Sequence, residues 1–221
     1  MITTPLPVLI RAAKKSAFVF FDKSESPDAA IEEIIEYATQ ARKDGIVSLE
    51  SRVADITDLF LKKALGLAVD GIESSRIRDI MELEIQLFEE QIDSESKVFE
   101  AAGGYAPTIG IIGAVLGLIQ VMKSLSNIDE VGHGIAVAFV ATIYGVAAAN
   151  IIFLPAAGKL KARGVAEVQI RELMLEGVLA IAEGTNQKLI RLKLEAYLEQ
   201  SPAGKLAKQK GGSAAPVTAE G

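Results

Sequence analysis

Two long stretches without a charged residue constrain this chain more than any other feature. Residues 105–122 form the first stretch, of 18 residues, and residues 134–158 form the second, of 25. A helix rises about 1.5 Å per residue, so roughly 20 apolar residues cross a hydrocarbon core about 30 Å thick. The first stretch reaches that length with the uncharged residues 101–104. The pattern predicts a transmembrane hairpin with helices at about 103–123 and 134–156. The alternative is a buried hairpin of a soluble protein.

Composition excludes several classes of function. The formal net charge of −6 offers no basic footprint for nucleic acid. The chain has no cysteine and a single histidine, His133, so neither a disulfide nor a multi-histidine metal site can be built within one copy. We therefore expect no metal, no cofactor and no nucleic-acid partner.

The charges beside the two stretches predict their orientation. The short loop between them carries Lys123 against Asp129 and Glu130. Basic residues follow the second stretch directly, and the positive-inside rule places such residues in the cytoplasm. We expect both termini of the chain in the cytoplasm and the loop outside. The basic residues are Lys159, Lys161 and Arg163.

Residues 26–104 are rich in charge and predict a cytoplasmic domain of helices. Ser26, Pro27 and Asp28 are typical of a helix start, and Gly45 is typical of a helix end. A second helix is expected from about Ser48 to Leu65, and a third from about Ser75 to Ala102, with a turn at VDGIES between them. No useful alternation of period two predicts a strand.

The chain after the second stretch also predicts helix. The second membrane helix is expected to continue past Lys159 until Gly184, and Asn186 can cap a last helix within residues 159–200. The tail, residues 201–221, is small and polar and predicts disorder. The fold class is all-α: an integral membrane hairpin (105–158) with helical cytoplasmic segments, preceded by an N-terminal segment (1–25).

Small residues recur along both apolar stretches. In lipid, glycines at helical spacing let two helices approach closely. They predict helix packing, either within the hairpin or against other subunits, and both remain open. The glycines concerned are Gly110, Gly113 and Gly117 on the first stretch and Gly145 on the second.

Polar groups inside the stretches are few, and none of them is Asp, Glu, Lys, Arg or His. Thr108 and Thr142 could offer hydroxyls to water or an ion, although a single threonine usually bonds to its own helix backbone. Proton relays inside membranes usually need an ionisable side chain, so a partner would have to supply the carboxylate. Pro107 starts the first stretch, where a missing N–H does no harm, and Pro155 can kink the second and serve as a hinge. No catalytic constellation is present, so we do not expect an enzyme.

Two segments carry a resemblance to a known family. AAGGYAPTIGIIGAVLGLIQVM (101–122) and VGHGIAVAFVATIYGVAAANIIFLPAAGKLK (131–161) resemble the MotA family of flagellar motor stator subunits, which is related to TolQ and ExbB. The resemblance implies an ion-driven stator in the bacterial inner membrane. Several MotA-like chains would surround MotB-like chains, whose membrane aspartate takes the ion, and a rotor switch-complex protein would receive the torque.

The resemblance also implies roles for individual residues. Pro107 and Pro155 match the family's two functional prolines, and Thr142 matches the threonine that lines its ion path. Ala114 stands where some members have a threonine associated with sodium use, and this alanine favours protons.

The resemblance also suggests where the rotor is contacted. Arg52 and Asp58, after the GIVSLE stretch, are the nearest candidates for rotor contact.

One difference from the family pattern keeps other functions open. Family members begin with two further transmembrane helices. The segment PLPVLIRAAKK, which starts at residue 5, resembles the stretch that follows the second of these helices. We therefore expect the two helices to be missing from this sequence. The missing helices favour one alternative, a membrane scaffold that transports nothing. A second alternative, independent of them, is an energiser of an envelope partner like ExbB or TolQ.

Overall fold

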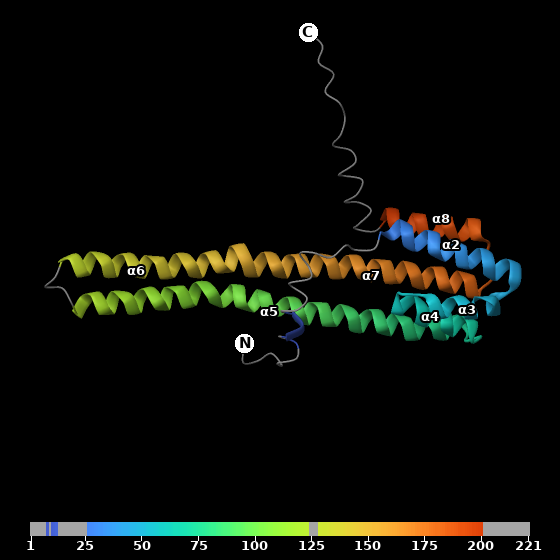
Figure 1. Ribbon diagram of the computed structural model, residues 1–221, viewed down its shortest axis with the longest axis horizontal. Coiled ribbons are helices and arrows are strands. Elements are labelled where there is room, and N and C mark those ends of the chain that lie inside the picture. Colours follow the sequence, from blue (N-terminus) through green and yellow to red (C-terminus); the bar gives the residue numbers. More distant parts are fainter. Residues whose placement is uncertain (1–7, 9, 13–25, 124–127, 201–221) are drawn as a thin grey trace, which may run out of the picture. The chain divides into compact units, whose positions relative to one another are not determined.

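The computed structural model describes residue 8 and residues 10–12, 26–123 and 128–200, apart from the side chains of residues 129–130 and 199–200. Most of the predicted N-terminal segment, including the stretch from residue 13 to 25, and the predicted disordered tail, 201–221, lie outside the described residues. The described residues hold helices and no strand, which agrees with the all-α prediction (Figure 1).

The chain divides into two compact units. One contains residues 90–164 and is called the hairpin unit below. The other contains the described residues of 23–89 and 165–221 and is called the bundle unit. The bundle unit takes its helices from two chain segments that are far apart in sequence, whereas residues 90–164 of the hairpin unit are one continuous segment.

The bundle unit begins with α2, Pro27–Asp44, whose ends follow the predicted signals. The side chain of Ser26 accepts a hydrogen bond from the N–H of Ala29 at 3.2 Å, and Pro27 takes the first turn, where its missing N–H is harmless. Gly45 ends the helix with φ 83°, a backbone conformation that favours glycine.

The second predicted helix is wrong in its extent. A short 3-10 helix, η1 (Ile46–Leu49), leads into α3 (Glu50–Asp55), and a separate helix, α4 (Leu59–Val69), follows. The break arises because Ile56 is extended, with ψ 124°, and the carboxylate of Asp58 caps α4 by accepting from the N–H of Leu61 at 2.7 Å. The turn predicted at VDGIES is confirmed, with Gly71 at φ 75°.

The third predicted helix and the first membrane helix are a single helix, α5, Ser74–Lys123. Neither the glycine pair at 103–104 nor Pro107 ends it. The prediction that Pro107 starts a helix is therefore wrong, because the charged segment before it is already helical. In the interior of a helix, a proline leaves the carbonyl four residues earlier, here that of Gly103, without its usual donor.

The return path is also nearly continuous. α6 (Ile128–Ala147) passes into a π-helical segment, η2 (Ala148–Phe153), and then into α7 (Leu154–Ala182). The predicted stop at Gly184 is confirmed by its φ of 70°. Asn186 accepts from the N–H of Lys188 at 3.0 Å ahead of α8, Gln187–Gln200, as its predicted capping role requires.

The bundle unit has one apolar core, to which α2, α4, α5, α7 and α8 all contribute. Burying a large aliphatic side chain stabilises a fold by about 1.5–3 kcal/mol, so this core holds the five helices together. Its fully buried large members are Ile34, Leu49, Leu61, Leu65, Ile77, Met81, Leu173, Met174, Leu179, Ile190 and Leu194.

Candidate functional site

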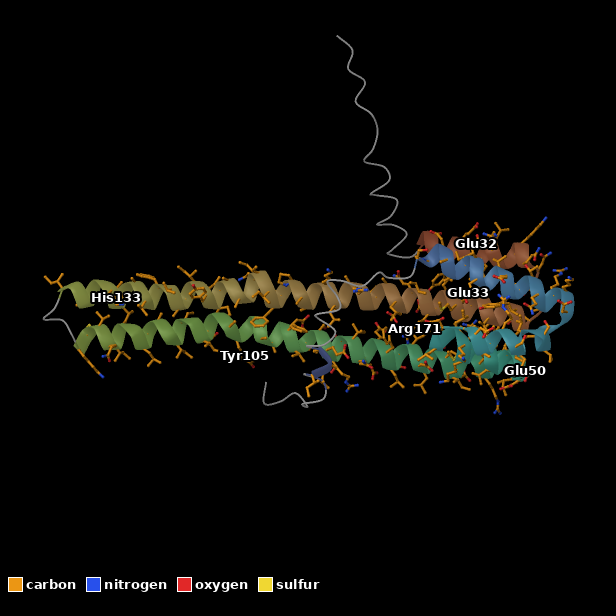
Figure 2. All side chains as sticks on the ribbon, viewed as in Figure 1. Glu32, Glu33, Glu50, Tyr105, His133 and Arg171 are labelled. Atoms are coloured by element: carbon orange, nitrogen blue, oxygen red, sulfur yellow. The ribbon has the colours of Figure 1, made fainter. Side chains whose placement is uncertain are left out.

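The apolar residues of the hairpin unit face outward. Two helical stretches, Ser74–Lys123 and Val131–Ala182, each contain a window long and apolar enough to cross a membrane. Only 11% of each window is buried inside the structure. A core helix of a soluble protein would be mostly buried, so this exposure favours the membrane hairpin over the soluble alternative. Figure 2 shows His133 near the loop end of α6 and Tyr105 further along α5.

The backbones of α5 and α6 approach each other closely at a pair of glycines. A Cβ built on Gly145 would lie 2.7 Å from the carbonyl oxygen of Ala106 and 3.0 Å from Cα of Gly110. A Cβ on Gly110 would lie 2.9 Å from the carbonyl oxygen of Ala141. Backbone cannot move aside as a flexible side chain can, so the two helices keep this separation only with glycine at both positions.

Two more glycines continue the same contact toward the loop. A Cβ on Gly113 would lie 3.3 Å from that of Ala141, and a Cβ on Gly117 would lie 3.2 Å from that of Ala138. All four glycines of the predicted packing set therefore face α6 or α5 within one hairpin.

The structure separates the polar candidates of the hairpin. Thr142 is half-buried beside the glycine contact, and its Cα would lie 3.4 Å from a Cβ on Gly110. Thr108 is exposed and precedes Gly110 by two residues, which places it on the opposite side of α5. Ala114, one helical turn after Gly110, is half-buried. Within the described part of the chain, neither threonine hydroxyl makes a hydrogen bond that meets ordinary geometric criteria.

The π-helical segment, which ends two residues before Pro155, was not predicted. The N–H of Leu154 donates to the carbonyl of Ala149, five residues earlier, instead of four. The side-chain amide of Asn150 donates to the carbonyl of Val146 at 2.9 Å. Single π turns are uncommon and occur frequently at functional sites. The sequence shows only an asparagine and a proline in an apolar run, and neither specifies a π turn.

The two candidates for rotor contact line one surface groove of the bundle unit, together with Tyr37. The guanidinium of Arg52 pairs with Glu36 at 2.5 Å and lies 5.7 Å from the ring centre of Tyr37. The hydrogen bond that Arg52 donates to Glu36 raises the pKa of Arg52, which stays charged. Asp58 has the capping role at α4 described above.

Charged groups also attach α8 to the bundle unit. The carboxylate of Glu176 accepts from Arg78 at 2.6 Å and from Lys193 at 2.5 Å. Burial opposes its ionisation, but the hydrogen bonds from Arg78 and Lys193 outweigh burial and hold the pKa of Glu176 below its usual value. Arg191 binds Glu32 of α2 through two hydrogen bonds, at 2.6 and 2.8 Å.

Arg171 of α7 joins three helices of the bundle unit. Its guanidinium lies 3.8 Å from the ring centre of Phe88 on α5 and 5.5 Å from that of Phe60 on α4. It also pairs with Glu167 at 2.9 Å (Figure 2). Cation–π contacts of a largely buried arginine stabilise such junctions by about 0.5–2 kcal/mol. Sequence reasoning missed this residue because its partners are remote in the chain.

Comparison with known families identifies the chain's relatives. A model of the MotA/TolQ/ExbB proton channel family matches residues 52–173. The chain is 42% identical to Motility protein A of Bacillus subtilis over 189 residues, which cover 84% of this chain and 70% of that protein. It is 34% identical to the chemotaxis protein PomA of Vibrio alginolyticus over 189 residues, covering 86% and 74% of the two chains.

Solved structures agree with these relatives. The C. jejuni MotAB structure matches with a TM-score of 0.86 and 34% identity, over 92% of this chain and 80% of that one. The flagellar MotAB stator complex of Bacillus subtilis matches with a TM-score of 0.82 and 38% identity, over 95% and 81%. These matches confirm the predicted all-α membrane fold.

Proposed function

The chain belongs to the MotA/TolQ/ExbB proton channel family, and we propose that its hairpin unit is the wall of an ion path that a partner's carboxylate completes. It is a MotA-type stator subunit of the bacterial flagellar motor, a membrane protein that forms an ion channel with a MotB-type partner and converts ion flow into torque. Its family is one of channel and stator subunits and is not an enzyme family.

The composition of the two apolar stretches supports the proposal that this chain forms the wall of the ion path and the partner supplies the carboxylate. The two apolar stretches contain no Asp, Glu, Lys, Arg or His, although their outward faces are exposed. An ion that crosses the membrane beside them needs a titratable or charged group to take it up and release it. The partner would provide this group as a membrane aspartate, and several copies of the present chain would surround it.

Thr142 is the proposed contribution of this chain to the ion path. Its position beside the glycine contact and a hydroxyl that bonds to no described group support this role. Thr108 points to the opposite side of α5, so it would act on the path from the face turned toward the partner or a neighbouring copy. Ala114 adds no hydroxyl, which favours protons over sodium.

Pro107 and Pro155 are proposed as the flexible points of the hairpin. Each removes a backbone donor, and the π-helical segment ends just before Pro155. A helix with a missing hydrogen bond bends at lower cost, so these positions would absorb the movement that follows protonation of the partner.

Arg52 and Asp58 are proposed to contact the rotor switch-complex protein from their common groove. Arg52 is 42% exposed in its side chain and keeps its charge. The orientation follows from Lys159, Lys161 and Arg163, which would hold the bundle unit and both termini on the cytoplasmic side of the inner membrane.

Complementation tests the function. We expect the gene, expressed with its MotB-type partner, to restore swimming to a strain that lacks its stator. Thr142→Val should abolish the rescue at unchanged membrane levels, whereas Thr142→Ser should retain it. Membrane insertion without any rescue would contradict the stator function, and full rescue by Thr142→Val would contradict only the role of the threonine.

A further inference from the structure

The bundle unit exposes an apolar stripe on α5. It consists of Ile80, Leu83 and Leu87, which are 40%, 56% and 56% exposed. Their spacing of three and four residues places them on one face of the helix. The core side of α5 carries Ile77 and Met81, both fully buried, so the stripe lies on a different face.

A second stripe with the same spacing lies on α8. It consists of Leu189 and Leu192, 59% and 63% exposed, and the exposed Ala196. Ile190 and Leu194 hold α8 to the core from its other side. No other part of the chain that the structure describes covers either stripe, and each runs over about two helical turns.

Ion pairs and ring contacts give the direction of α5. Arg78 pairs with Glu176 of α7, and Phe88 lies against Arg171 of α7. Residue numbers rise along α5 as they fall along α7, so the two helices are antiparallel within the bundle unit (Figure 1).

Two contacts with α7 likewise give the direction of α8. Lys193 pairs with Glu176, and the hydroxyl of Tyr197 bonds to Glu172. α8 is thus antiparallel to α7 and parallel to α5. Copies related by rotation about an axis along these helices preserve this direction, so α5 of one copy meets α8 of the next as a parallel pair.

We propose that the α5 stripe of one copy packs on the α8 stripe of the neighbouring copy, forming the cytoplasmic contact of the stator ring. This inference rests on the proposed assembly of several copies. In a parallel pair Ile80, Leu83 and Leu87 align with Leu189, Leu192 and Ala196, as the a, d and a positions of a heptad. The contact is heterologous, since two different surfaces meet, and contacts of this type form a ring when the rotation from copy to copy closes.

The charges beside the stripes match this register. In a parallel heptad pair, each g position lies near the e position five residues further along the partner helix. Asp79 and Glu84 are the g and e positions of the α5 stripe, and Lys188 and Lys193 are those of the α8 stripe. Both cross pairs, Asp79 with Lys193 and Glu84 with Lys188, are therefore of opposite sign. Two of these groups also have partners within their own copy: Lys193 donates to Glu176, and Glu84 accepts from Lys63, both at 2.5 Å. An ammonium has three N–H groups and a carboxylate has two oxygens, so each can serve a second partner.

Disulfide cross-linking tests the contact cleanly, because the natural chain has no cysteine. The full chain would carry Leu83→Cys and Leu192→Cys, at the two aligned d positions, and would be oxidised in membranes of cells that also make the partner. We expect a ladder of linked copies from the double variant and none from either single variant. A disulfide needs Cβ atoms about 3.8 Å apart, so distant surfaces do not link.

Controls separate this contact from other arrangements. Lys43→Cys combined with Leu192→Cys places the first thiol at the exposed end of α2 and should give no ladder. Within a copy, neither Leu83 nor Leu192 lines the groove between α5 and Tyr197 of α8, so a link inside one chain is not expected. Linked dimers from a single variant, or a double variant no better than the Lys43 control, would overturn the proposal.

A charge exchange gives a second readout. Lys188→Glu should lower the ladder yield about twofold through repulsion from Glu84, and Glu84→Lys in the same chain should restore it. Failure of the second change to restore the yield would contradict the register. Swimming is scored separately. If the cysteine-free chain restores swimming but the double cysteine variant gives no ladder, only the proposed contact is contradicted. If the ladder forms but swimming is not restored, only the stator function is contradicted.

Discussion

Gly103 and Leu154 touch: a Cβ on Gly103 would lie 2.8 Å from Cδ2 of Leu154. Gly103 is the residue whose carbonyl loses its donor to Pro107, and Leu154 is the residue between the π-helical segment and Pro155. The irregular points of the two membrane helices therefore meet at one level of the hairpin unit. A bend in one helix at this level would be felt directly by the other.

The glycine contact predicts a graded response to alanine. Gly145→Ala should destabilise the hairpin by about 1–3 kcal/mol, because its Cβ meets the backbone of Ala106 at 2.7 Å. Gly103→Ala should cost less, since the Leu154 side chain can rotate away. Gly104→Ala is the matched control, with nothing within 4 Å of its Cβ. Thermal stability of the detergent-solubilised complex measures all three, and equal effects of the Gly145 and Gly104 changes would refute the contact.

Asn150→Ala should loosen the π-helical segment by removing the hydrogen bond to the carbonyl of Val146. Bonds of this kind contribute about 0.6 kcal/mol inside membranes, so the chain should still insert. Hydrogen exchange of the amides of residues 148–153 should become faster, while exchange in residues 111–117 stays unchanged. Unaltered exchange at 148–153 would show that the side chain does not hold the segment.

The pKa of Glu176 predicts acid sensitivity of the bundle unit. Because its folded pKa lies below the usual 4.5, the ion pairs stabilise the fold above about pH 4.5, and this stabilisation is lost as pH falls through the folded pKa. Glu176→Gln should cost about 1–3 kcal/mol near neutral pH and flatten the pH dependence below 4.5. Glu183→Gln, at an exposed position, is the control. Thermal unfolding followed by circular dichroism between about pH 3 and 7 measures the difference.

The capping role of Asp58 can be separated from its proposed role at the rotor. Asp58→Ser removes the charge but keeps an oxygen that can accept from the N–H of Leu61, whereas Asp58→Ala loses both and should cost about 1 kcal/mol. If the charge contacts the rotor, the serine variant should reduce swimming at normal protein levels. Normal swimming of the serine variant would leave Asp58 with the cap alone.

Arg171 should matter for stability more than its surface charge suggests. Arg171→Lys keeps the charge but loses the planar group that lies over Phe88 at 3.8 Å, and it should lower the melting temperature of the bundle unit. Arg163→Lys, the same exchange in the hairpin unit, should leave the bundle unit's melting temperature unchanged. An equal response to both exchanges would rule out a special contribution from the ring contact.

Signals that act over a few residues were sufficient for much of the fold. Ser26 with Pro27, Gly45, Gly184 and Asn186 each mark a helix end through a bond or a backbone angle within one turn. The two uncharged stretches predicted the membrane hairpin, because the thickness of the membrane requires apolar helices of about that length. The residues of these stretches also carry the resemblance to the MotA family, which the family model and the identity to Motility protein A of Bacillus subtilis confirm.

Where the signals were local but conflicting, the sequence was insufficient. The apolar pattern from Ser48 to Leu65 predicts one helix, but α3 ends at Asp55 and the cap at Asp58 starts a separate helix, α4. Pro107 is typical of the start of a helix, but α5 continues through it because the residues on both sides of Pro107 are helical.

The sequence by itself determined the class of the protein, the presence of the hairpin and the absence of Asp, Glu, Lys, Arg and His from its two apolar stretches. Only the tertiary structure decided that Gly110 meets Gly145, that Thr142 lies beside this contact while Thr108 turns away, and that a π turn precedes Pro155. The physical reason is range. Membrane thickness and helix caps act on neighbouring residues, whereas backbone approach and side-chain direction depend on how helices distant in sequence pack together.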